Sequence, residues 1–170
     1  STSKSFDIEK AESYYQIGLT YEAQGKNGQA LLYYYRNISL NKAIGKEENA
    51  TNSLYYIAGI YETQGQLDKA LENYETCLRI ETEYGYKEDL ISTLNGIGMV
   101  YNDLGDFDKA KEYYNKSLAL TLEFNDEVGT SNALNNLANI FSDQGDYYSA
   151  LELYYKSLKI SEKIDDKALI

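Results

Sequence analysis

The chemistry open to this chain is limited by the residue types that it lacks. Its 170 residues include no His, no Trp and a single Cys, Cys77. A Ser-His-Asp or Cys-His nucleophile, a His-bearing zinc or haem site and an internal disulfide are therefore excluded. Two acidic pairs, Asp106/Asp108 and Asp143/Asp146, are expected at helix ends, where carboxylates interact favourably with the helix dipole. We expect no catalytic residue set, no metal site and no cofactor, and we expect Cys77 to be a buried, inert thiol.

Charge and hydropathy exclude further classes. The chain has 16 Lys plus Arg against 27 Asp plus Glu, a formal net charge of −11, and contains no basic run. Binding to the phosphates of nucleic acid needs clustered positive charge, so a nucleic-acid partner is not expected. No apolar run approaches the roughly 20 residues of a membrane-spanning helix, so membrane insertion is not expected either. A single cysteine favours the cytoplasm, while a periplasmic or other exported location stays open because the chain begins at Ser1 rather than at Met.

A repeat with a period of 40 residues runs through the chain. It is marked by columns of equivalent residues. These columns are Gly25/65/105/145, Ala30/70/110/150, Tyr34/74/114/154, Tyr21/61/101 with Phe141, Ile17/57/97 with Leu137, and the small residues Gly18, Ala58, Gly98 and Ala138. Four repeats are expected at about 7–44, 47–84, 87–124 and 127–164 of a single domain spanning 1–170. Residues 165–170 are expected to begin a further, truncated repeat, because Asp166-Lys167-Ala168-Leu169-Ile170 matches Tyr86-Lys87-Glu88-Asp89-Leu90.

Each repeat is expected to be a pair of antiparallel helices. In the third repeat, Leu94, Ile97, Gly98 and Tyr101 follow the i, i+3, i+4, i+7 spacing of one helix face, and a second face follows Gly105. Gly at that position suits the left-handed backbone of a helix C-cap. Positions 45, 85, 125 and 165 are Gly, Gly, Asn and Asp, which predicts a second helix stop in every repeat. The eight helices are expected at 7–24, 27–44, 47–64, 67–84, 87–104, 107–124, 127–144 and 147–164.

These columns resemble the tetratricopeptide repeat. The family's pattern of apolar, Gly/Ala, aromatic, Gly, Ala and aromatic residues falls on Ile97, Gly98, Tyr101, Gly105, Ala110 and Tyr114, and equally in the other repeats. The resemblance implies an all-α fold, a right-handed α-solenoid of four antiparallel helix pairs. The chain departs from the ordinary 34-residue form in its period and in the absence of Pro after the second helix. It looks like the long form found in kinesin light chain, Pins-type adaptors, Rap-type regulators and arrays attached to bacterial signalling enzymes.

The resemblance also implies a concave groove lined by the first helix of each pair. We call the corresponding positions, 12, 15, 19, 22 and their equivalents at intervals of 40, the inner row. The residues predicted to bind a partner are Tyr15, Asn52, Tyr55, Glu62, Asn95, Met99, Asn102, Asn132, Asn135 and Asn139. Asn amides carry a donor and an acceptor that match a peptide backbone. The alternative is that these asparagines are merely solvated in an Asn-rich chain.

The inner row also indicates which partner to expect. It contains no Lys or Arg, so it lacks the cations with which other members of the family clamp an acidic C-terminal tail. Glu12, Glu22 and Glu62 favour a basic ligand end. We therefore expect a non-enzymatic interaction module for a neutral to basic protein or peptide. The alternative function is a regulatory or sensory segment of a larger signalling protein, such as a histidine kinase, cyclase or transcription regulator. Self-association through the terminal repeat faces stays open.

Overall fold

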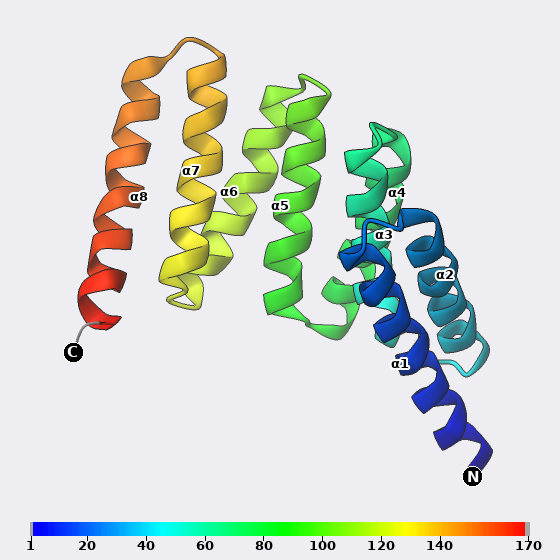
Figure 1. Ribbon diagram of the computed structural model, residues 1–170. Coiled ribbons are helices and arrows are strands. Elements are labelled where there is room, and N and C mark those ends of the chain that lie inside the picture. The colour runs from blue at the N-terminus through cyan, green and yellow to red at the C-terminus, as the bar shows by residue number, and fades with distance from the viewer. Residues whose placement is uncertain (1, 169–170) are drawn as a thin grey trace. The chain divides into compact units, whose positions relative to one another are not determined.

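The computed structural model describes the backbone of residues 2–168 and the side chains of residues 5–165. Eight α-helices occupy this part of the chain (Figure 1). They are α1 (Thr2–Ala23), α2 (Asn27–Ala43), α3 (Thr51–Thr63), α4 (Leu67–Tyr84), α5 (Lys87–Asp103), α6 (Phe107–Glu123), α7 (Glu127–Asp143) and α8 (Tyr147–Ala168). A short 3₁₀-helix, η1 (Glu47–Ala50), precedes α3, and the described residues include no strand. The expected all-α fold with eight helices is confirmed.

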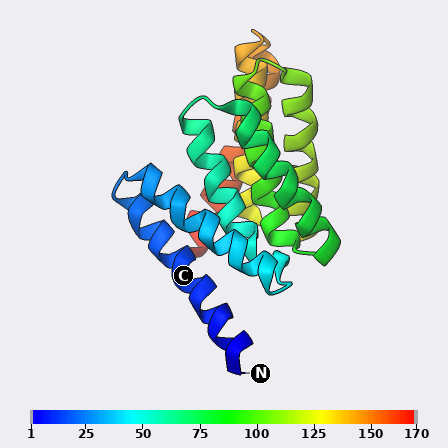
Figure 2. The same ribbon diagram turned by 90° about the vertical axis from the view of Figure 1, so that its right-hand side faces the viewer.

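The chain divides into two compact units, Ser1–Tyr86 and Lys87–Ile170, each built from two helix pairs. In the first unit α1 packs against α2 and α3 against α4, and α2 also contacts α3. In the second unit α5 packs against α6 and α7 against α8, and α6 also contacts α7. Short turns make the helices of each pair antiparallel (Figure 1). The start of α1 extends past the end of α2, as the blue hairpin in Figure 2 shows.

The turns lie where the repeat predicts them. Gly25, Gly65, Gly105 and Gly145 separate the helices of the pairs with φ between 70° and 79°. This left-handed backbone is accessible to Gly without a steric penalty. Asp106 caps the helix that follows by accepting a hydrogen bond from the backbone N–H of Lys109 at 3.2 Å, and Asp146 does the same for Ser149.

The expected stop at the end of each second helix is seen in three repeats. Gly45, Gly85 and Asn125 have φ values of 67°, 74° and 53°. The stop expected at Asp165 was wrong, because α8 continues through this residue to Ala168. Asp has a Cβ atom and enters the left-handed region less readily than Gly, so nothing local to Asp165 ends the helix. Residues 169 and 170 lie outside the described residues, and the further repeat stays a prediction.

The core of each unit forms where the second helix of one pair meets the first helix of the next. In the first unit, Ala30 and Tyr34 of α2 pack with Ile57 and Ile60 of α3, and all are at most 3% exposed. In the second unit the equivalent cluster joins α6 to α7 and consists of Ala110, Tyr114, Leu137 and Ile140. Neither helix of a pair buries its whole apolar surface within that pair, so adjacent pairs within each unit stack on one another.

None of the described helices is both long enough and apolar enough to cross a lipid bilayer.

Candidate functional site

The inner row lies on the first helix of each pair, and none of the predicted binding residues is fully buried. Those exposed to solvent are Asn52, Met99, Asn132 and Asn139. Those that are half-buried are Tyr15, Tyr55, Glu62, Asn95, Asn102 and Asn135. The two units carry different chemistry along this row and are described in turn.

In the first unit, the inner row is part of a tyrosine cluster. We use this term for Tyr15, Tyr34, Tyr55, Tyr56 and Tyr74. The ring centroid of Tyr56 lies 6.1 Å from that of Tyr15 and 5.8 Å from that of Tyr55. Tyr56 also stacks on Tyr34 at 5.8 Å, and Tyr55 meets Tyr74 edge-on at 5.5 Å. Such pairs fix the orientation of the rings, so the side chains of Tyr15 and Tyr55 are held in place by their neighbours.

Two carboxylates of the inner row are tied to this tyrosine cluster. Tyr34 Oη donates a hydrogen bond to Glu22 Oε2 at 2.5 Å, and Tyr74 Oη donates to Glu62 Oε2 at 3.2 Å. Burial raises the pKa of both hydroxyls well above the usual range, and the neighbouring carboxylates raise it further. Both hydroxyls therefore stay protonated at neutral pH and remain donors, which holds Glu22 and Glu62 in fixed positions.

In the second unit, the inner row of α5 carries amides in place of carboxylates. Asn95 Oδ1 and Asn102 Oδ1 are buried and accept no hydrogen bond from any described residue. Met99 lies between them along the same helix face, with its side chain 45% exposed. A buried amide oxygen without a donor costs about 1–3 kcal/mol. These two oxygens are thus acceptors that folding leaves without a donor among the described residues.

The inner row of α7 continues this amide character. Asn132 is exposed and Asn135 half-buried, and Asn139 Oδ1 accepts a hydrogen bond from Tyr154 Oη. Within the second unit, α5 also contacts α7. In the first unit, Tyr56 links the predicted residues Tyr15 and Tyr55.

Tyr56 is the residue that the sequence analysis missed. Its equivalents in the other repeats are Gln16, Gly96 and Asn136, so its column shows no common residue type. The repeat pattern therefore carried no signal for its position over Tyr34. The sequence did contain a signal for the hydrogen bonds to Glu22 and Glu62. Each glutamate precedes a core tyrosine by 12 residues, and this spacing recurs in the first two repeats.

The other candidate groups have structural roles. Cys77 is fully buried and its Sγ lies 3.4 Å from the backbone oxygen of Thr51. Asp106 and Asp146 are the helix caps described above. Within the part of the chain that the structure describes, no cluster of three or more acidic or thiol side chains is arranged to hold a metal ion.

Comparison with solved structures identifies similar folds. The chain aligns with BtubC (BKLC) from P. vanneervenii at a TM-score of 0.84 and 18% identity, covering 91% of this chain and 64% of that one. It aligns with the apo form of RapI at a TM-score of 0.85 and 22% identity, covering 94% of this chain and 58% of that one. Aspartyl phosphate phosphatase F from Bacillus subtilis gives a TM-score of 0.84 at 19% identity, and the alignment covers 94% of this chain and 42% of that one. The chain thus spans about two thirds of the first of these proteins and less of the others.

Comparison of sequences identifies the family. No curated protein matches the chain. Profiles of the tetratricopeptide repeat match residues 11–44, 49–123 and 130–164. These segments overlap all four of the helix pairs found in the described part of the chain. The chain belongs to the tetratricopeptide repeat family.

Proposed function

We propose that the chain is a non-enzymatic protein-interaction module that binds an extended peptide segment along its inner row. The observation that carries this proposal is the pair of buried, unpaired amide oxygens at Asn95 and Asn102. Folding leaves these two acceptors without donors. Both side chains are half-buried, so a rotation of the amide would present its oxygen to a backbone N–H group of a peptide and restore the lost hydrogen bond. Met99, between them on the same helix face, is flexible enough to repack against a ligand side chain.

The first unit supports the same class of ligand by a different chemistry. Tyr15 and Tyr55 offer rigid aromatic rings with a small entropic cost of ordering, which suits contact with a peptide side chain. Glu12, Glu22 and Glu62 make this part of the inner row acidic, and no Lys or Arg of the row balances them. The ligand we propose is therefore neutral to basic, and an acidic C-terminal tail does not fit.

The test begins with peptides selected from a random displayed library against the intact chain. The best peptide is titrated by calorimetry against the wild type, Asn95→Ala and Asn135→Ala. Each substitution should weaken binding by about 0.5–1.5 kcal/mol, the net contribution of one hydrogen bond, which is a factor of about 2 to 12. Asn115→Ala is the matched control, because Asn115 is an exposed asparagine on α6, outside the inner row. Unchanged affinity in both inner-row variants would rule out the amide contacts.

A modified peptide identifies which of its groups is bound. Methylation of single backbone nitrogens removes one N–H donor at a time. The methyl group that weakens binding to the wild type should have a smaller effect in Asn95→Ala, since the same interaction has already been removed. Equal losses in the wild type and the variant would assign the contact to another part of the peptide.

A second candidate function is a regulatory segment within a longer protein. This chain covers 58% of RapI and 42% of aspartyl phosphate phosphatase F, so related folds occur within longer chains. In this case binding at the inner row would be coupled to an attached domain. The reading frame around this segment tests the idea, and a lone repeat array would argue against it.

A further proposal is self-association through α8. Tyr155 and Leu158 of α8 are 67% and 51% exposed. Leu118, the repeat equivalent of Leu158, packs in the core cluster that joins α6 to α7. A second copy that presents α1, with Ile17 at the position of buried Leu137, would cover α8 in the same way. Light scattering of the wild type and Leu158→Glu tests this, and a concentration-independent monomeric mass for the wild type would contradict it.

A further inference from the structure

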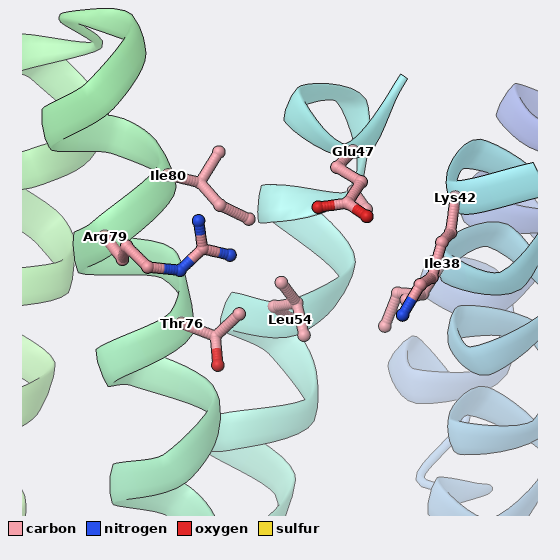
Figure 3. Close-up of a pocket in the computed structure, with 8 residues that line it drawn as sticks. Ile38, Lys42, Glu47, Leu54, Thr76, Arg79 and Ile80 are labelled. Atoms are coloured by element: carbon pink, nitrogen blue, oxygen red, sulfur yellow. The ribbon is translucent and has the colours of Figure 1, made fainter. Parts of the chain in front are cut away.

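A pocket of about 160 Å³ lies in the first unit, away from the inner row. Figure 3 shows it between α2 and α4, with α3 behind and η1 above. Its inner wall is apolar: Ala50, Leu54 and Ile80 are at most 9% exposed, and Ile38 is half-buried. An engineered apolar cavity of about 150 Å³ holds one benzene molecule. The pocket is therefore large enough for one branched aliphatic side chain.

Charged side chains surround the apolar wall. Arg79 on α4 directs its guanidinium into the space between the helices, Lys42 approaches from α2, and Glu47 lies above on η1 (Figure 3). Among the described side chains, neither Lys42 nor Glu47 forms an ion pair. Arg79 pairs with Glu83 at 3.4 Å, but both side chains are about 60% exposed, so this pair contributes little and is easily exchanged. Two cations are thus available beside an apolar wall in a protein whose net charge is −11.

The repeat itself does not require a cation at the position of Lys42. The equivalent positions 80 residues further along the chain are Leu122, in the third repeat, and Lys159, in the fourth. Since Leu122 is apolar, a cation at position 42 is a property of this one pocket and not of the fold.

Glu47 is also left free by a local change in the repeat. Lys87 pairs with Glu123 at 2.9 Å and Glu127 with Lys163 at 2.6 Å, which ties the start of each first helix to the end of its partner. The residues at the corresponding positions of the second repeat are Glu47 and Glu83, which have the same charge and cannot pair. Glu47 therefore remains an unpaired acceptor at the pocket.

We propose that this pocket binds the C-terminal residue of a peptide when that residue is aliphatic, such as leucine. The aliphatic side chain would lie against Leu54 and Ile80. The carboxylate would pair with Arg79, whose planar guanidinium suits two parallel hydrogen bonds, and with Lys42. Glu47 would accept the amide N–H of the same residue. The pocket shares no residue with the inner row, so this site is independent of the peptide-binding function proposed above.

The test uses N-acetyl-L-leucine, which reproduces a C-terminal leucine with its amide and carboxylate. The intact chain is labelled with ¹⁵N and titrated up to on the order of 10 mM. We expect saturable shifts of the backbone amides of Ala50, Leu54 and Ile80. N-acetyl-L-leucinamide lacks the carboxylate and N-acetylglycine lacks the aliphatic group, so each should bind at least about tenfold more weakly. Equal binding of the leucinamide, or no saturable shift, would overturn the proposal.

Variants assign the binding to the pocket. Lys42→Leu installs the residue of the equivalent position, and Arg79→Ala removes the guanidinium; each should weaken binding at least about threefold. Lys159→Ala, at the position equivalent to Arg79, is the control and should bind as the wild type does. Free L-leucine binding more tightly than N-acetyl-L-leucine would overturn the assignment to a peptide end, because Glu47 would then be pairing with an ammonium group. Asn95→Ala should leave this titration unchanged even if it abolishes binding at the inner row.

Discussion

The ring of Tyr34 lies directly on the backbone of Gly18, so that a Cβ atom at Gly18 would stand 2.5 Å from Tyr34 Cε1. Gly98 and Tyr114 repeat this relationship in the second unit, at 2.6 Å. Gly59 differs, because the nearest atom to a Cβ built there is Tyr74 Oη at 3.9 Å, an ordinary contact distance. Glycine therefore has a packing role at two of these positions and none at the third.

Alanine substitutions should separate these roles. Gly98→Ala gains about 1 kcal/mol of helix propensity but forces the Tyr114 ring to move, and overpacking of this kind costs about 1–3 kcal/mol. We expect a net fall of about 1 kcal/mol in the free energy of unfolding. The cost is limited because Ala58 and Ala138 occupy this column in the other pairs. Gly59→Ala should instead raise the free energy of unfolding by up to about 1 kcal/mol.

Urea unfolding of both variants measures the difference. A rise for Gly98→Ala as large as that for Gly59→Ala would show that the tyrosine ring is not tightly held.

The repeat was sufficient to predict the helices, because period and turn residues act locally. The expected helix at 67–84 matches α4 (Leu67–Tyr84), and the other helices end within a few residues of their predicted ends, apart from those at the two ends of the chain. The third helix differs at its start, where η1 precedes α3. Lys46 precedes this segment and makes no side-chain cap, whereas Asp126 caps α7 through the backbone N–H of Gly129 at 2.9 Å. The missing cap alone does not explain η1, because α2 and α4 also begin without a side-chain cap and are not preceded by a 3₁₀-helix. The shared columns of the repeat carry no signal for this turn.

Alkaline pH should destabilise the fold through its buried tyrosines. Burial raises the pKa of Tyr74, and the charge of Glu62 raises it further. Unfolded tyrosines ionise from about pH 10, where folded Tyr74 still keeps its proton, so the folded state then binds more protons than the unfolded state. The contribution of Tyr74 to stability is full below about pH 10 and is lost as the pH rises from there through the folded-state pKa. The loss approaches about 1.4 kcal/mol per pH unit for one tyrosine.

Tyr74→Phe provides the measurement. Its free energy of unfolding, determined in urea between about pH 8 and pH 11, should fall less steeply with pH than that of the wild type, by about one proton. Tyr148→Phe is the matched control, because Tyr148 is 83% exposed, and it should leave the slope unchanged. Identical slopes for Tyr74→Phe and the wild type would contradict the argument.

Glu83→Lys should supply the ion pair that the second repeat lacks. It would place a cation where Lys163 pairs with Glu127 in the fourth repeat, opposite Glu47. It would also replace an acidic residue in the last turn of α4, where the helix dipole favours a cation. The change also breaks the Arg79–Glu83 pair, but that pair is exposed and contributes little. We expect a net gain of about 0.3–1 kcal/mol at low salt, the usual range for exposed pairs and dipole effects.

Thermal unfolding at low and high salt checks this gain. At about 1 M salt, where charges are screened within about 3 Å, most of the gain should disappear. Glu83→Gln separates the two causes, since it removes the unfavourable charge without adding a cation. A Glu83→Lys variant no more stable than Glu83→Gln would show that Glu47 is not reached.

The candidate site was less accessible to sequence analysis than the fold. The inner-row positions lie on the first helix of each pair, and their spacing follows from the helix period alone. Their role in binding stays a prediction. Whether Asn95 Oδ1 finds a donor depends on the packing of side chains from several elements, and its unpaired state emerges only in three dimensions. The pocket beside Leu54 is of the same kind, since its lining comes from four separate elements.

Asn102 provides a test that joins stability to function. Its Oδ1 atom is buried and unpaired in the described structure, so replacing the side chain with leucine removes a polar group that folding leaves unsatisfied. A buried unsatisfied group costs about 1–3 kcal/mol, and we expect Asn102→Leu to raise the free energy of unfolding by about 1 kcal/mol. The same variant should bind the selected peptide less well, because the acceptor is gone. Higher stability together with weaker peptide binding is the result expected for a residue that serves binding at the expense of stability. If Asn102→Leu instead lowers stability and leaves peptide binding intact, the amide serves the fold and the inner row must bind its ligand by other groups.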